Sequence, residues 1–220
     1  VAVLLDEGYL TDVRTAAAGA VAAKYFAPKN IEAIGIIGTG IQAKMQLRYL
    51  QKTNPCKKVW VWGRTAENAT KFKEELKNDF DIHIAAFPSE IAKNCNIIVS
   101  TTPSELPLLQ ADDIRLGTHI TAVGSDTSDK QELDSIILKK ADLVIADSLP
   151  QSKSRGEIYQ AVTKGHIDEG KVVELGTAIQ NPNLQRTNEE QITVVDLTGV
   201  AVQDIMITKA VYLSHRQEND

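Results

Sequence analysis

The sequence predicts an α/β fold in which a doubly wound, mostly parallel sheet carries helices on both faces. Short apolar runs that are typical of buried strands alternate with amphipathic or alanine-rich runs that are typical of helices. A glycine-rich turn, Gly38-Thr39-Gly40, joins one of these strands directly to the helix that follows it. Strands and helices that alternate with short connections build a parallel sheet, because each helix crosses over the sheet to the next strand.

The elements are expected in the following order. Residues 1–6 resemble a strand, and residues 11–27 resemble a helix that Thr11 or Asp12 caps and that Pro28 ends. Apolar runs then predict strands at 33–38, 58–63, 82–87, 96–102, 118–125 and 142–147. Periodic runs between them predict helices at 41–53, 65–79, 88–94 and 130–141. Beyond Asp147 the alternation weakens, and we expect a helix at 154–167, a loop at 179–190, a strand at 191–199 and a closing helix at 200–215.

Composition and charge exclude several classes of protein. Hydrophobic residues make up 43% of the 220 residues and the net charge is −5, so no basic field favours nucleic acid as a partner. No apolar run approaches the roughly 18 residues of a membrane span, and no signal peptide is visible. Cys56 and Cys95 lack metal or redox spacing and the four histidines form no cluster, so we expect no metal and a cytoplasmic location.

The glycine turn has the pattern Gly38-x-Gly40-x-x-Ala43 between a strand and a helix. In a Rossmann unit the first glycine makes the tight turn, the second lets a diphosphate approach the main chain, and the third small residue lets helix and strand pack closely. The helix N-terminus then offers free N–H groups to the phosphates. The pattern therefore predicts a dinucleotide-binding domain, with a purely structural glycine turn as the alternative.

The end of the next strand indicates which dinucleotide binds. An acidic residue there binds the ribose 2′-hydroxyl of NAD, whereas an arginine accommodates the 2′-phosphate of NADP. This chain has Gly63-Arg64-Thr65 and no acidic residue at that point. We therefore expect NADP to be preferred over NAD, with a solvated Arg64 as the alternative.

Ligands of open α/β sheets lie outside the carboxyl ends of the strands, so polar residues at those ends are candidates. Asp126 follows one such strand and either handles the proton of an amine or caps a helix. Arg14 stands in the first turn of a helix, where its charge opposes the helix dipole, so we expect a compensating anion from the protein or from a substrate. Lys130 is either a dinucleotide contact or a surface lysine.

Six stretches, in order along the chain, together resemble the ornithine cyclodeaminase/mu-crystallin family. The further stretch "STTPSELPLL" at residues 100–109, together with "VGSD" at residues 123–126, looks most similar to members linked to ectoine utilization. The six stretches span nearly the whole chain and lie at residues 10–25, 34–50, 59–69, 121–134, 141–158 and 192–204.

The resemblance implies a homodimeric, NAD(P)-dependent enzyme that acts on the C–N bond of an amino acid or its imine. It would be a cyclodeaminase, an amino-acid dehydrogenase or an imine reductase. Residues 1–28 would be part of a dimerisation and substrate domain, residues 29–195 the Rossmann domain, and residues 196–220 a helix that returns to the first domain. The alternatives are a non-enzymatic, mu-crystallin-like NADPH-binding protein and a shikimate-dehydrogenase-like oxidoreductase.

The resemblance also implies roles for single residues. Arg14 resembles the arginine that binds the substrate carboxylate, and Asp126 resembles the catalytic aspartate that handles the amine proton. The matching cofactor contacts are Thr39, Gly40, Ile41 and Gln42 at the diphosphate, Arg64 and Thr65 at the adenosine ribose, Thr101, Val123 and Gly124 beside the nicotinamide, and Lys130 and Thr198. Family members have a further N-terminal segment that supplies another arginine and a lysine, and this chain begins without a methionine. We therefore expect a longer parent protein.

Overall fold

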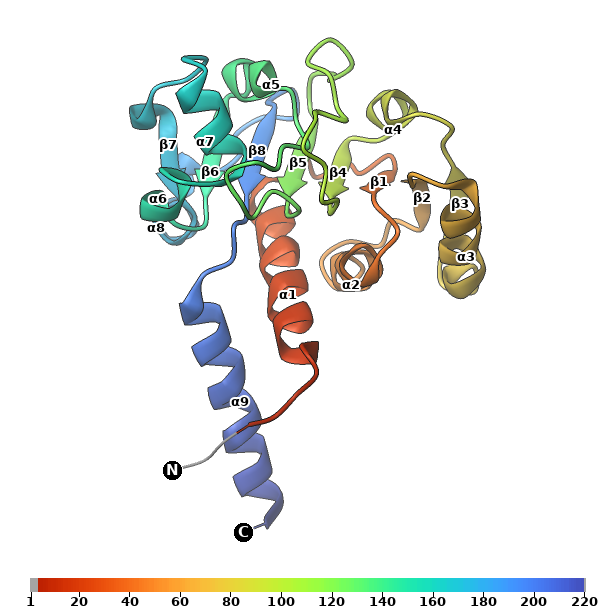
Figure 1. Ribbon diagram of the computed structural model, residues 1–220, viewed down its shortest axis with the longest axis vertical. Coiled ribbons are helices and arrows are strands. Elements are labelled where there is room, and N and C mark those ends of the chain that lie inside the picture. Colours follow the sequence, from red (N-terminus) through yellow and green to blue (C-terminus); the bar gives the residue numbers. More distant parts are fainter. Residues whose placement is uncertain (1–3, 220) are drawn as a thin grey trace.

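The structure is a computed structural model that describes residues 4–219. Its centre is an eight-stranded sheet with the strand order β3-β2-β1-β4-β5-β8-β6-β7 (Figure 1). Every pair of neighbouring strands runs parallel. The strands are β1 (Ile34–Ile37), β2 (Lys58–Trp62), β3 (Asp81–Ile84), β4 (Ile97–Ser100), β5 (His119–Ala122), β6 (Leu143–Ala146), β7 (Val172–Glu174) and β8 (Thr193–Asp196).

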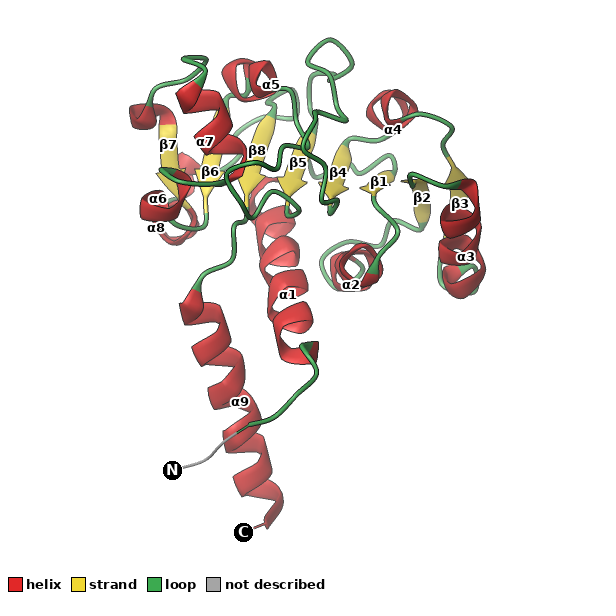
Figure 2. Cartoon of the chain, in the orientation of Figure 1, coloured by secondary structure: helices red, strands yellow, loops and turns green. Residues whose placement is uncertain are grey.

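Helices cover both faces of this sheet (Figure 2). They are α1 (Tyr9–Phe26), α2 (Ile41–Leu50), α3 (Ala66–Leu76), α4 (Pro88–Asn94), α5 (Ser135–Lys140), α6 (Leu149–Ser152), α7 (Gly156–Thr163), α8 (Leu175–Gln180) and α9 (Ala201–Asn219), with short 3₁₀ helices at Glu169–Lys171 and Pro182–Leu184. The predicted doubly wound α/β fold is confirmed. No helix within residues 4–219 is long and apolar enough to cross a membrane.

The apolar strand runs are explained by burial on both faces. All four residues of β1 are buried, as are those of β4, β5 and β8. Along β1, Ile34 and Ile36 belong to the core beneath α1, α2 and α3, whereas Ile37 belongs to the opposite core beneath α4, α5 and α7. A strand that is buried on both sides needs apolar residues at every position, which is why these runs do not alternate with polar residues.

The order of the strands places a crevice beside β1. β1 pairs with β2 on one side and with β4 on the other, so the chain winds in opposite directions from this point. The loops that leave β1 and β4 therefore separate at their carboxyl ends and leave room for a ligand.

α1 packs tightly against the sheet and α2. A Cβ atom on Gly19 would collide with the side chain of Gln46, which donates a hydrogen bond to the Thr15 carbonyl at 3.1 Å. At the end of α1, the carbonyl of Phe26 accepts a hydrogen bond from the Thr193 hydroxyl at 2.9 Å. α9 extends away from the sheet beside α1 (Figure 1). The assignment of the two ends of the chain to a second domain stays a prediction.

Four expectations about the elements are wrong. Residues 4–6 form no strand, and Leu5 is 92% exposed; residues 1–3 lie outside the described part of the chain. α1 begins before Thr11 and Asp12, and the Asp6 carboxylate instead accepts a hydrogen bond from the Leu10 amide at 2.6 Å.

The other two corrections concern the second half of the sheet. The helix expected at 130–141 begins only at Ser135, because a bridge between Leu109 and Leu133 keeps the preceding residues extended. β7 and α8 lie in a segment for which the sequence predicted no element. β7 is a three-residue strand at the edge of the sheet, too short to give a periodic pattern.

Candidate functional site: the cavity at the glycine turn

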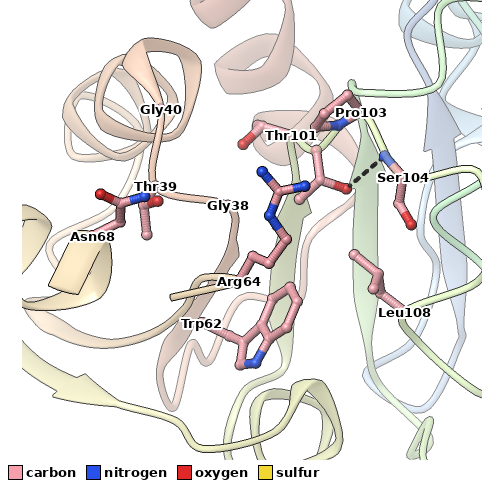
Figure 3. A pocket seen from close by; sticks show the side chains of 11 residues that line it. Gly38, Thr39, Gly40, Trp62, Arg64, Asn68, Thr101, Pro103, Ser104 and Leu108 are labelled. Atoms are coloured by element: carbon pink, nitrogen blue, oxygen red, sulfur yellow. Dashed lines mark hydrogen bonds between the residues drawn. The ribbon is translucent and has the colours of Figure 1, made fainter. Parts of the chain in front are cut away.

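A cavity of about 280 Å³ opens at the carboxyl ends of β1, β2 and β4 (Figure 3). We call it the glycine-turn cavity. None of its lining residues is acidic, so the cavity suits an anionic ligand. The lining residues are Gly38, Thr39, Gly40, Trp62, Arg64, Asn68, Thr101, Thr102, Pro103, Ser104 and Leu108.

The two glycines of the turn are required for different reasons. Gly38 has φ of 116°, and a Cβ atom there would lie 2.5 Å from the Thr101 hydroxyl oxygen, so the fold itself requires glycine. Gly40 has φ of −76°, which any residue can adopt, and a Cβ atom there would meet nothing within 4 Å. The protein alone therefore gives no reason for glycine at position 40, whereas a ligand pressed against the main chain does.

The start of α2 faces the same space without a cap. Gly40 provides no side chain to accept hydrogen bonds from the first turn, and that turn contains no acidic residue. Uncapped N–H groups and the positive end of the helix dipole make an anion site at this point. The turn therefore fits the diphosphate of a dinucleotide.

The neighbours of the turn contribute less through their side chains. Ile41 is 66% exposed. The Gln42 amide donates a hydrogen bond to the Asp12 carboxylate at 2.7 Å, which ties α2 to α1. Only the main chain of Gln42 is thus available to a ligand in this arrangement.

Arg64 lies at the end of β2 and lines the cavity. Figure 3 shows its side chain reaching up between Gly38 and Thr101. Within residues 4–219 its guanidinium makes no hydrogen bond or ion pair with the protein, so it is available to a ligand. Thr65 begins α3 and accepts a hydrogen bond from the Asn68 amide at 3.4 Å, so its hydroxyl serves as a helix cap.

Sequence reasoning did not single out five of the lining residues. A signal was present for Asn68, which lies in the first turn of the helix after Arg64, and for Pro103 and Ser104, which lie in the loop after β4. Strand periodicity gave no reason to select the apolar walls at Trp62 and Leu108. The missed residues are Trp62, Asn68, Pro103, Ser104 and Leu108.

The expected nicotinamide side lies at the ends of β4 and β5. The Thr101 hydroxyl donates a hydrogen bond to the Ile37 carbonyl at 3.3 Å and thereby joins β4 to β1. Val123 is 9% exposed. A Cβ atom on Gly124 would collide with the main chain of Thr102, so the two strand ends touch and glycine is required there.

Asp126 and Lys130 lie together after β5. Their side chains form an ion pair at 2.6 Å, and the Asp126 side chain is 55% exposed. No helix begins at Asp126, so the alternative that it is a helix cap is wrong; Asp134 caps α5 instead. Asp126 lies two residues after Gly124, in the loop that leaves the carboxyl end of β5, so this loop is at the same edge of the sheet as the glycine turn.

Arg14 and Thr198 are both occupied within the protein. The Arg14 guanidinium binds the Asp204 carboxylate of α9 at 3.0 Å and is 15% exposed. The expected compensating anion is thus a protein carboxylate in this structure. The Thr198 hydroxyl donates to the Asp147 carboxylate at 3.0 Å and accepts a hydrogen bond from Gln151 at 2.9 Å.

Three buried carboxyl groups lie behind the strand ends and were not predicted. Glu132, Glu157 and Asp196 are at most 1% exposed. Burial raises the pKa of each of them, and that of Glu157 to about 8. Glutamates in polar segments usually face solvent, so nothing in the sequence pattern indicated that Glu132 and Glu157 are buried.

The buried Glu157 predicts a pH dependence of stability. Its pKa rises from the ordinary 4.5 to about 8 in the folded protein, so between these values the folded state holds a proton that the unfolded state has lost. Stability therefore falls as pH rises through this window, by about 1 kcal/mol per pH unit. His119, whose pKa burial lowers from 6.5 to about 3, acts in the opposite sense only below pH 6.5.

Urea unfolding between pH 6.5 and 8 excludes the contribution of His119, and comparison with Glu157→Gln separates Glu157 from the other buried carboxyl groups. We expect the free energy of unfolding to decrease across this range. Glu157→Gln should lower stability at every pH but flatten the slope. A wild-type stability that rises with pH in this range would contradict the assignment.

Comparison with known proteins identifies the family. Residues 1–219 match the sequence profile described as the ornithine cyclodeaminase/mu-crystallin family. The chain belongs to this family. The expected resemblance is thus confirmed, and membership of the ornithine cyclodeaminase/mu-crystallin family decides against the shikimate-dehydrogenase-like alternative.

Relatives within the family carry different names. An uncharacterized cyclodeaminase of Sinorhizobium fredii is 42% identical over 209 residues, which are 94% of this chain and 63% of that relative. An archaeal alanine dehydrogenase dimer with bound NAD superposes with a TM-score of 0.89 at 38% identity, covering 96% of this chain and 66% of the other. The Thermococcus litoralis Δ1-pyrroline-2-carboxylate reductase, in complex with NADH and L-proline, gives a TM-score of 0.90 at 30% identity, with the same coverage. The chain therefore spans slightly less than two thirds of the length of these relatives.

Proposed function

We propose that this chain is the cofactor-binding part of an enzyme that moves hydride between a nicotinamide dinucleotide and the C–N bond of an amino acid or its imine. The observation that carries the proposal is the bare main chain at Gly40, which faces a cavity without acidic residues at the switch point of the sheet. The three chemistries named for the relatives, cyclodeamination, alanine dehydrogenation and imine reduction, all act at such a C–N bond and support this substrate class.

Residues of the cavity and of the chain next to it would each hold one part of the cofactor. The uncapped start of α2, with Thr39 and Gly40, would hold the diphosphate. Arg64 and Thr65 bind the adenosine ribose, and Thr101, Val123 and Gly124 form the wall for the nicotinamide. When bound, the cofactor supplies or accepts the hydride. The apolar wall of the cavity, which includes Trp62 and Leu108, would shield the bound dinucleotide from water.

Asp126 is the residue proposed to handle protons. Its carboxylate is more than half exposed at the strand edge and accepts a charge-assisted hydrogen bond from Lys130. A carboxylate there takes a proton from the amine nitrogen in one direction and returns it in the other. Arg14 is proposed to bind the substrate carboxylate, which requires it to share or exchange its contact with Asp204.

NADP is the cofactor that Arg64 favours, although the structures compared above contain NAD or NADH. The free guanidinium offers a fork to a 2′-phosphate, and none of the lining residues offers a carboxylate to a 2′-hydroxyl. We expect Arg64→Asp to reverse the preference, because the new carboxylate repels the phosphate and accepts from the hydroxyl. The ratio of the dissociation constants of NADPH and NADH, measured by fluorescence titration, checks this prediction.

We expect that ratio to change by at least about tenfold, since a charge-assisted hydrogen bond contributes about 1.5–3 kcal/mol. Arg48→Asp provides the control, because Arg48 lies in the last turn of α2 and does not line the cavity. An Arg64→Asp variant that keeps the wild-type preference for NADPH rules out this role.

Assembly and substrate are further parts of the proposal. We propose a cytoplasmic homodimer: the archaeal alanine dehydrogenase is described as a dimer, and Val202, Ile205 and Met206 on α9 are about 60% exposed. The link to ectoine utilization rests only on the motifs at 100–109 and 123–126, and the names of the relatives above do not mention ectoine. We therefore propose small amino acids and cyclic imines as the substrate class.

The test is a turnover assay with this chain and NADPH. Δ1-pyrroline-2-carboxylate, and pyruvate with ammonia, are offered in turn while NADPH absorbance is followed. Consumption of NADPH supports the enzyme. Binding of NADPH without turnover of any of these substrates supports the non-enzymatic, mu-crystallin-like alternative. If neither NADPH nor NADH binds, the enzyme and the binding-protein hypotheses are both contradicted.

A further inference from the structure

Glu132 is fully buried behind the strand ends, and its carboxylate accepts four hydrogen bonds. One oxygen accepts from the Thr102 amide at 2.5 Å and the Thr102 hydroxyl at 2.8 Å. The other accepts from the Ser100 hydroxyl at 2.8 Å and the Gly124 amide at 2.9 Å. Each carboxylate oxygen is therefore paired with one main-chain N–H and one hydroxyl.

These four donors belong to two different strand ends. Ser100 is the last residue of β4 and Thr102 follows it, whereas Gly124 follows β5. The two main chains are in contact, because a Cβ atom on Gly124 would collide with Thr102 and lie 2.8 Å from the Glu132 carboxyl carbon. Thr102 lines the glycine-turn cavity. Glu132 thus holds together the two strand ends that form the proposed nicotinamide wall.

The same residue closes the base of the loop that carries Asp126. The chain leaves β5 at Gly124, runs through Asp126 and returns at Glu132. Within this loop the Ser125 hydroxyl donates to the Lys130 carbonyl at 2.6 Å. Glu157 of α7 holds Glu132 from behind by accepting a hydrogen bond from its amide at 2.7 Å. The carboxylate of Glu132 is therefore bound at the start of the loop, at Gly124, and its main-chain N–H is bound at the end of the loop, by Glu157.

We propose that Glu132 is a positioning residue that sets the spacing between Thr102 and Gly124, and with it the nicotinamide wall and the loop of Asp126. The proposal rests on the proposed function. Glu132 is buried and acts only through the residues that it binds. A carboxyl group is needed because both of its oxygens can accept from a main-chain N–H.

Glutamine cannot replace it in either orientation. Its amide group has one acceptor and one donor, so the donor must face the N–H of either Thr102 or Gly124. One buried N–H then loses its acceptor, and the strand ends must separate to reach water or another partner. Glu132→Gln thus alters the nicotinamide wall without changing any residue that lines the cavity.

The experiment compares two ligands that differ only in the nicotinamide. NADPH and 2′-phospho-ADP-ribose share the diphosphate and the adenosine end, so their affinity ratio reports the nicotinamide wall alone. In Glu132→Gln we expect NADPH to bind about tenfold more weakly, with 2′-phospho-ADP-ribose unchanged. We also expect faster hydrogen exchange at the main-chain N–H of Thr102 or of Gly124, whichever loses its acceptor. A general loss of stability would weaken both ligands together.

Control variants keep the outcome decisive. Glu105→Gln makes the same chemical change on an exposed side chain after β4 and should behave as wild type. Ser100→Ala removes one hydroxyl donor and should lower the same ratio by a smaller factor, so it decides the question if Glu132→Gln does not fold. A wild-type ratio of the two affinities in folded Glu132→Gln, or in Ser100→Ala if Glu132→Gln does not fold, overturns the proposal for Glu132. A wild-type chain that binds neither ligand overturns the proposed function as well.

Discussion

Replacing Gly40 with valine is expected to abolish dinucleotide binding while leaving the fold intact. The backbone at Gly40 has an ordinary φ of −76°, and a side chain there points into open space. The valine would occupy the space in which the diphosphate approaches the start of α2. Loss of two hydrogen bonds to a charged group costs about 3 kcal/mol, so the dissociation constant for NADPH should rise by roughly 100-fold or more.

Two other glycines provide the controls for this prediction. Gly38→Val should destabilise the protein, because its φ of 116° is strained for valine and the new side chain meets Thr101. Gly170→Val should change neither stability nor binding, because the added Cβ meets nothing within 4 Å and the site is remote from the cavity. Unchanged NADPH affinity in a folded Gly40→Val variant would show that no phosphate lies on this turn.

Asp126→Asn is expected to leave cofactor binding unchanged and to abolish turnover. Asparagine keeps the shape of the side chain and can still accept a hydrogen bond from Lys130, but it cannot take up a proton from an amine. General acid–base catalysis contributes about 100- to 10,000-fold, so kcat should fall within that range. Stopped-flow measurement of hydride transfer, together with NADPH titration, separates the two quantities.

Asp129→Asn is the matched control, since Asp129 carries a carboxylate on the same exposed loop. Asp129→Asn should retain wild-type turnover with whichever substrate the NADPH turnover assay identifies. If Asp126→Asn also turns over at the wild-type rate, Asp126 has no part in the chemistry and the proton must come from another group.

The fold was predictable where burial on both faces of the sheet requires apolar residues along a whole strand. Strands such as β1, which are buried on both faces, must be apolar throughout, and their alternation with helices left little doubt about a parallel sheet. Prediction failed where tertiary contacts decide the local structure. Glu132 lies in a stretch with good helix formers, yet its carboxylate and amide are both held by distant strands and helices, and this keeps the segment out of a helix.

The site was predictable in part for a similar reason. The glycine turn and Arg64 could be recognised because, in a Rossmann fold, the residues that contact the diphosphate and the adenosine ribose stand at fixed positions after the first and second strands. The partners of Arg14 and Thr198 could not be predicted, because Asp204 and Asp147 are distant in the sequence. Burial of Glu157 and Asp196 depends on how α7 packs behind β8, which no local pattern records.

Amide NMR of the start of α2 during a titration with NADPH tests the central claim most directly. The main-chain N–H groups of Gly40, Ile41 and Gln42 should shift saturably and with one dissociation constant, because they donate hydrogen bonds to the diphosphate. Resonances of these three residues that do not move while NADPH binds elsewhere, or no association of NADPH or NADH at all, would contradict the account.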